Sequence, residues 1–175
     1  LLMAQQAPPP ASSDDSKMIA FATQKVKEAL NGADASVVFE IEPAPDKRES
    51  FAIRKSASGE IRVTGSDGAG AMYGGLEVAE LIRIGGVANV TATAQQPRME
   101  MRGVKFNIPL DVRTPSYTDL GDASQHNIET VWDYAFWTAF IDELALHRYN
   151  FISLWNMHPF PCLLYTSDAA DEEDS

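Results

Sequence analysis

Two apolar runs on either side of a helical segment constrain the second half of this chain most strongly. Residues 103–110 (GVKFNIPL) and 151–155 (FISLW) have the composition of short strands that are apolar on both faces. Between them, residues 131–147 place Phe136, Phe140 and further apolar side chains at helical spacing. Strands of this kind occur in parallel sheets covered by helices. The pattern therefore predicts a βαβ unit like the opening of a (β/α)8 barrel.

A long polar segment, Asp111 to Asn127, joins the first expected strand to the helix. Loops between strands and helices usually have only a few residues, so this segment is longer than a connection between two elements requires. Barrel active sites are assembled from the loops at the carboxyl ends of the strands. We therefore expect this loop to contribute to a site, and its structural alternative is a surface excursion that only shields the barrel.

The first half of the chain has the pattern of a small α+β layer. The expected elements are a helix over 17–30, strands over 36–41, 51–55 and 61–64, and a helix over 68–84. The last two strands should form a hairpin. The predicted fold class is therefore α/β, with a small N-terminal α+β domain followed by the first βαβ unit of a truncated (β/α)8 barrel.

The glycines of residues 68–74 (GAGAMYG) suggest a dinucleotide-binding loop at first sight. Their spacing differs from that motif by one residue, and the preceding strand belongs to a hairpin instead of a parallel βαβ unit. We interpret the small residues as a helix face that packs closely on the sheet.

Charge and composition exclude several classes of function. The chain has 14 Lys and Arg against 25 Asp and Glu, a formal net charge of −11, and 45% of its 175 residues are apolar. Nucleic acids and anionic membranes are bound by clustered Lys and Arg, which are absent here, so no nucleic-acid partner is expected. No apolar run approaches the roughly 20 residues of a membrane span.

Metal and cofactor sites have no sequence signal either. His126, His147 and His158 lack metal-ligand spacing, and Cys162 is the single cysteine. His147 has the position of a helix C-terminal residue beside the last carbonyls. The sequence thus predicts no metal and no cofactor, and it does not indicate an oligomeric state.

The two ends of the chain are interpreted apart from the fold. Residues 1–16 should hold a signal-peptide remnant and a Pro-rich linker, which predicts an exported protein, periplasmic or extracellular. Residues 162–175 resemble one translated frame of a sequencing adapter, and we expect them to be an artefact. The alternative is a genuine acidic tail.

Several segments carry a family resemblance. They are residues 63–67 and 70–83, residues 101–107 (MRGVKFN), residues 141–150 (IDELALHRYN) and residues 152–155 (ISLW). Together they resemble the small α+β domain and the first barrel strands and helix of family 20 β-hexosaminidases and family 67 α-glucuronidases. The resemblance covers nearly all of residues 17–161. It implies an accessory domain over 17–96 and the start of a catalytic barrel over 97–161.

The resemblance also implies where the chemistry lies. These enzymes use two carboxyl groups, or one carboxylic acid assisted by the substrate's acetamido group. In both families the catalytic acids follow later barrel strands, so this fragment should hold no catalytic residue and should be inactive by itself. The adjacent pair Asp142 and Glu143 points in different directions on a helix and is expected to be solvated surface.

The fragment can still hold part of a sugar-binding rim at the carboxyl ends of its two barrel strands. The candidates are Asn107, Asp111 and Arg113 after the first strand, and Trp155, Asn156 and His158 after the second. Amide, carboxylate and guanidinium groups give directed hydrogen bonds to hydroxyls, and an indole face suits the apolar side of a pyranose. For Trp155, a place in the barrel core is an equal alternative.

Two classes of function follow. The first is an exported glycoside hydrolase that cleaves a terminal uronic acid or N-acetylhexosamine from a polysaccharide or glycoconjugate. The second is a non-catalytic carbohydrate-binding or structural module. The sequence leaves the sugar, its linkage and its anomeric configuration open.

Overall fold

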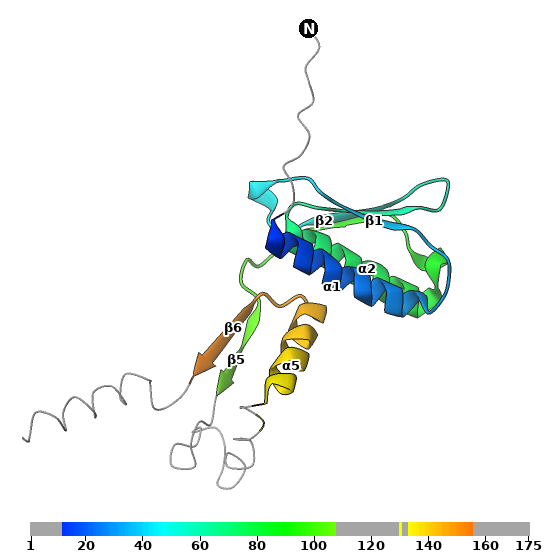
Figure 1. The fold of residues 1–175 in the computed structure, drawn as a ribbon. Coiled ribbons are helices and arrows are strands. Elements are labelled where there is room, and N and C mark those ends of the chain that lie inside the picture. Colours follow the sequence, from blue (N-terminus) through cyan, green and yellow to red (C-terminus); the bar gives the residue numbers. More distant parts are fainter. Residues whose placement is uncertain (1–11, 108–129, 131–132, 156–175) are drawn as a thin grey trace, which may run out of the picture. The chain divides into compact units, whose positions relative to one another are not determined.

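The computed structural model describes residues 12–107, 130 and 133–155, and the chain divides into two compact units. The first unit extends to Glu100 and the second begins at Met101. Figure 1 shows the elements of each unit. Each unit is described by itself below.

The first helix, α1, spans Ser13–Leu30 and begins earlier than the sequence pattern predicts. Its N-cap is Ser12, whose hydroxyl accepts a hydrogen bond from Asp15 N at 3.1 Å, while Asp15 Oδ2 accepts one from Ser12 N at 3.0 Å. This reciprocal capping box satisfies two backbone donors that would otherwise lack partners. Residues 13–16 therefore belong to the helix, which corrects their assignment to a linker.

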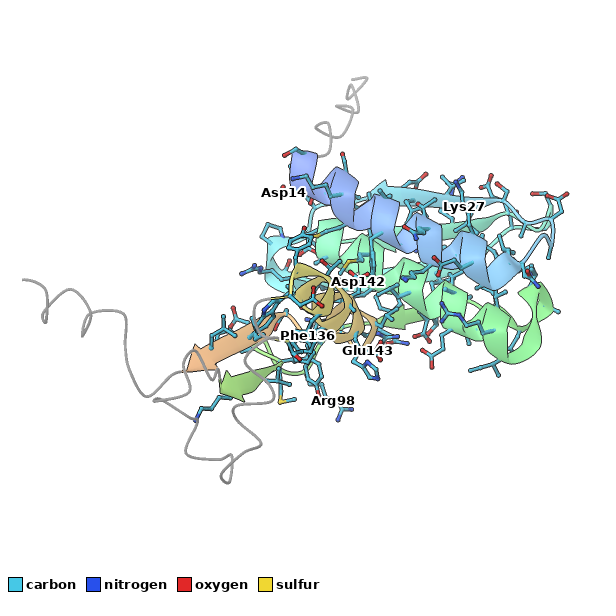
Figure 2. The ribbon with its side chains drawn as sticks, turned by 60° about the horizontal axis from the view of Figure 1, so that its bottom comes forward. Asp14, Lys27, Arg98, Phe136, Asp142 and Glu143 are labelled. Atoms are coloured by element: carbon cyan, nitrogen blue, oxygen red, sulfur yellow. The ribbon has the colours of Figure 1, made fainter. Side chains whose placement is uncertain are left out.

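Charges at the two ends of α1 agree with the helix dipole. Asp14 and Asp15 lie in the first turn and Lys27 lies in the last, as the labelled Asp14 and Lys27 in Figure 2 illustrate. Asn31 adopts the left-handed conformation, with φ 45°, and its N–H donates to Lys27 O. The end of the helix at residue 30, as predicted from the sequence, is confirmed.

Four strands form the sheet of the first unit. They are β1 Val37–Ile41, β2 Phe51–Lys55, β3 Ile61–Gly65 and β4 Thr93–Gln95, in the order β1-β3-β2-β4. The hairpin of β2 and β3 is confirmed, since Ile53 pairs with Val63 in antiparallel register. β1 pairs with β3 in parallel, and β4 adds an antiparallel edge to β2. The short 3-10 helices Pro45–Lys47 and Val87–Asn89 lie in the connections.

The second helix, α2, spans Gly68–Gly85 and lies beside α1 on one face of this sheet (Figure 1). Its glycines permit the close approach. A Cβ at Gly74 would lie 2.5 Å from Val63 Cγ1, and a Cβ at Gly75 would lie 2.6 Å from Phe39 Cε1. Both distances are too short for a side chain, so the interpretation of residues 68–74 as a packing face is confirmed.

The core of the first unit lies between α2, α1 and the sheet. Its largest fully buried side chains are Ile53, Ile61, Val63, Val78 and Val90. Ala22 of α1 and Ala79 of α2 are also fully buried. The predicted α+β layer is therefore present with its own hydrophobic core.

The second unit contains β5 Gly103–Asn107, α5 Tyr134–Leu146 and β6 Phe151–Trp155. β5 and β6 are parallel neighbours, as the sequence predicts. The helix is shorter than the expected 131–147, because Asp133 caps it by accepting a hydrogen bond from Ala135 N at 2.9 Å. The mixed α/β fold class is confirmed, and the closed barrel stays a proposal.

The side chains of the second unit are less buried than those of the first. No residue of α5 is buried, and Tyr134 is 84% exposed. Ile141, Phe151 and Leu154 are exposed as well. Among the described residues, β5 and β6 also have no third strand beside them.

We predict that limited proteolysis separates the two units. Trypsin should cut first at Arg102, Lys105 or Arg148, because a segment with few buried contacts opens locally at low cost. A resistant product should end near Arg98, as measured by mass spectrometry over time. A resistant core that retains Trp155 would show that the second unit is stable by itself.

We predict that the capping box makes stability depend on pH. The hydrogen bonds from Ser12 hold the pKa of Asp15 below its usual value, with a smaller contribution from the backbone of Gly68. A lowered folded-state pKa adds stability above the unfolded-state pKa, near 4, and this stability is lost as the pH falls through the folded-state value. Asp15→Asn should therefore lower Tm by about 2–5 °C at pH 7 and by much less at pH 2.5.

The control is Asp34→Asn, which removes an exposed carboxylate that makes no hydrogen bond or ion pair in the described part of the chain. Its Tm should follow that of the unchanged protein at both pH values. Equal Tm shifts for the two variants would contradict the assignment to the capping box.

Candidate functional site

The carboxyl ends of β5 and β6 bring two of the predicted rim residues together. The parallel register pairs Asn107 with Trp155 at the last position of each strand. Neighbouring strands lie roughly 4.8 Å apart, so the backbones of these two residues are adjacent. The sequence prediction that one sheet edge gathers both residues agrees with this register.

The other four rim candidates lie outside the described residues. They are Asp111, Arg113, Asn156 and His158. The same holds for the predicted loop from Asp111 to Asn127. Their roles remain predictions from the sequence.

A network at the opposite ends of these strands fixes their register. Arg102 N donates to Asn150 Oδ1 at 2.9 Å, and Arg102 O accepts from Asn150 N at 2.8 Å and from Phe151 N at 3.1 Å. Arg102 Nε also donates to Arg148 O at 2.9 Å. These four hydrogen bonds, named the strand clamp here, join segments that lie far apart in the sequence. Because the first residues of the two strands are paired, their last residues, Asn107 and Trp155, are paired as well.

A tight turn connects the end of α5 to the residues of the strand clamp. Arg148 has a positive φ of 61°, and its N–H donates to Ala145 O at 2.9 Å. Tyr149 N donates to Leu144 O at 2.9 Å. The left-handed residue reverses the chain direction directly after the helix, in the manner of a helix C-terminal cap.

The sequence places Arg102 and Asn150 within segments that resemble a family, but it gives neither residue a role. Its signal is weak, since it consists of one polar residue near the start of each apolar strand. The pairing joins a side-chain amide to a distant backbone group, and no local pattern encodes it. The clamp residues lie at the starts of the two strands, at the opposite ends from Asn107 and Trp155.

One member of the acidic pair on α5 lies beside His147 at the end of the helix. Glu143 and Asp142 are labelled in Figure 2. Glu143 has a 64% exposed side chain, and its Oε1 lies 3.4 Å from His147 Nδ1. His147 Nδ1 also lies 3.0 Å from Glu143 O at the end of the helix. The expected position of His147 beside the last carbonyls is confirmed.

The described part of the chain has neither a metal-binding group of side chains nor a membrane-spanning helix. In that part no group of three or more His, Cys, Asp or Glu side chains lies close enough to hold a metal ion. No described helix is long and apolar enough to cross a membrane.

We predict that Asn150→Ala loosens the start of the two strands. The Arg102 amide loses its acceptor, and a hydrogen bond of this kind contributes about 1 kcal/mol, or roughly fivefold in an opening equilibrium. Amide hydrogen exchange of Arg102, measured by NMR, should accelerate about fivefold. Asn150→Asp keeps an acceptor and is the matched control. Unchanged exchange in Asn150→Ala would mean that the backbone bonds alone hold the register.

Comparisons with known proteins find a likeness among the solved structures. No family model matches the chain, and no curated protein matches it. Among the solved structures, 8 chains match. One is described as a "GH138 enzyme targeting pectin rhamnogalacturonan II", with a TM-score of 0.65, 24% sequence identity and coverage of 82% of this chain.

The alignment covers 17% of that structure, so this chain spans about a sixth of its length. At this identity the likeness concerns the fold alone. It does not single out the hexosaminidase or glucuronidase families that the sequence resembles. The chain has a mixed α/β fold similar to part of a glycoside hydrolase structure.

Proposed function

We propose that this chain is the N-terminal part of a glycoside hydrolase. The observation that carries the proposal is the fold likeness to a GH138 enzyme over 82% of the chain. In this proposal residues 17–96 form an accessory domain and residues 97–161 open a (β/α)8 barrel. Activity then belongs to a longer protein, because such a barrel needs about eight strands to close.

The proposed role of the described strands is to position substrate. The clamp at Arg102 and Asn150 sets the start of β5 and β6, and the shared register sets their ends at Asn107 and Trp155. Polar groups at such ends line the mouth of a barrel. Bond cleavage would be carried out by carboxyl groups. The family resemblance implies that these groups follow later barrel strands.

The rim residues suit different parts of a sugar. Asn107, Asp111, Asn156 and His158 would bond hydroxyls, and Trp155 would contact the apolar face of the ring. Arg113 would form a bidentate pair with a uronate carboxylate. A terminal uronic acid and a terminal N-acetylhexosamine are the two candidate substrates.

Uronic acid is the first of the two to test. The similar enzyme is described as targeting a rhamnogalacturonan, and the name of that polymer denotes galacturonic acid among its sugars. Export of the protein, periplasmic or extracellular, is part of the same proposal and rests on the pattern of residues 1–16. A carbohydrate-binding module without catalysis is the alternative, in which the same surfaces bind glycan that is not cleaved.

The rim assignment predicts the activity of variants of the longer protein that this proposal requires. Asn156→Ala and His158→Ala should each lower kcat/KM by about tenfold or more, through loss of one directed hydrogen bond in the transition state. Arg113→Ala should have its largest effect on a uronide, because it removes charge pairing. The measurement is release of p-nitrophenol from p-nitrophenyl uronides and N-acetylhexosaminides.

The control variant is Arg83→Ala, which changes an exposed residue in the last turn of α2 and should leave kcat/KM unchanged. The chain of residues 1–175 by itself should release no p-nitrophenol. Parental kinetics and parental Tm in all three rim variants would contradict the rim assignment. Glycan binding by the longer protein without turnover of any glycoside would favour the non-catalytic module.

A further inference from the structure

One face of the four-stranded sheet of the first unit is not covered by α1 or α2. The two helices pack on the face that carries Phe39, Phe51 and Val63. Because successive side chains of a strand alternate between faces, the neighbouring positions lie on the other face. The strand register aligns four of them in one row across the sheet, and these are Glu40, Thr64, Ala52 and Ala94.

A pocket of about 400 Å³ lies over part of this row. Its lining includes Ala52, Thr64 and Ala94, together with residues from the connections that flank β1, β2 and β4. These three residues of the row present methyl groups where longer side chains would fill the space. The volume is in the range of pockets that bind small molecules.

Thr64 is a buried polar residue on this face, with 9% of its surface exposed. Its hydroxyl forms no hydrogen bond within the described part of the chain, although it lines the pocket. Buried hydroxyls normally have a partner, because an unsatisfied one is costly. The pocket is therefore the direction from which a partner can reach this hydroxyl.

The rim of the pocket adds donors and acceptors that are not used elsewhere. Glu42 and Lys47 are exposed and form no ion pair in the described ranges of the chain. Ser66 Oγ accepts a hydrogen bond from Ser50 N at 3.1 Å, which leaves its own proton free to donate. One ammonium, one carboxylate and several hydroxyls thus surround a floor of methyl groups.

This combination matches the chemistry of a sugar residue. A pyranose offers hydroxyls that both donate and accept, and it offers a C–H face that packs on small apolar groups. Nucleotides and phosphate groups fit less well, because the described lining has a single cation together with a carboxylate. A purely apolar ligand would leave the buried Thr64 hydroxyl without a partner.

We propose that this pocket, named the sheet-face pocket, binds one sugar residue of a glycan chain. The proposal rests on the proposed function, in that it takes the glycan to be the substrate class of the longer protein. It assigns to the accessory domain a binding subsite built only from residues of the first unit. No covalent step is involved.

The test uses the chain of residues 1–175 and two probes, trigalacturonate and tri-N-acetylchitotriose, in isothermal titration calorimetry. We expect saturable binding of at least one probe. Ala94→Leu places a larger side chain in the pocket and should weaken binding at least about tenfold. Ala88→Leu makes the same change at an exposed residue of a 3-10 helix and should bind as the unchanged chain does.

A second variant separates binding from folding. Thr64→Val keeps the shape of the side chain and removes only the unbonded hydroxyl, so Tm should stay the same or rise while affinity falls roughly fivefold. Lys47→Met should weaken trigalacturonate more than the neutral probe, because it removes the cation of the rim. Binding that survives both Ala94→Leu and Thr64→Val would overturn the assignment of the pocket, and so would failure of both probes to bind at concentrations up to about 10 mM.

The two proposals fail in different ways. Hydrolysis by the longer protein with no binding by residues 1–175 would overturn the sheet-face pocket and leave the glycosidase proposal intact. Binding that Ala94→Leu abolishes, in a longer protein that cleaves no glycoside, would support the pocket and overturn the glycosidase proposal.

Discussion

The close contact of α2 with its neighbours on both sides is the constraint on which the first unit depends. Gly74 faces Val63 of the sheet, and Gly75 faces Phe39 and Ala22. Any side chain at either glycine would push the helix away from β3 or from α1. Because both helices occupy one face, the other face stays open at the row that contains Thr64. The closely packed core and the pocket are thus two results of the same placement of α2.

Much of this arrangement follows from local patterns. Alternation predicts the hairpin of β2 and β3, helical spacing predicts α2, and the two apolar runs predict β5 and β6 as parallel neighbours. The pattern predicts the start of α1 too late, because the capping residue Ser12 directly follows a Pro-rich stretch. It does not predict β4, since three residues are too few to show alternation.

The candidate sites are less predictable, for a physical reason. The pairing of Asn107 with Trp155 follows from the rule that parallel strands end at one sheet edge. The strand clamp and the sheet-face pocket arise from long-range register, in which Arg102 reaches Asn150 and Ala52 aligns with Thr64 and Ala94. Each of these residues is ordinary in its own stretch of sequence. Their chemistry exists only after distant strands have paired.

The order of the strands along the chain has a consequence for synthesis on the ribosome. All partners of the four-stranded sheet are complete once β4 has been made, so the first unit can fold while the rest is still being translated. β5 emerges next, and its partner β6 follows only after α5. During this interval the apolar strand β5 has not yet paired with β6. The exposed strand is then available for a chaperone to bind. Slow codons between β5 and β6 would lengthen that exposure, and slow codons directly after β4 would not.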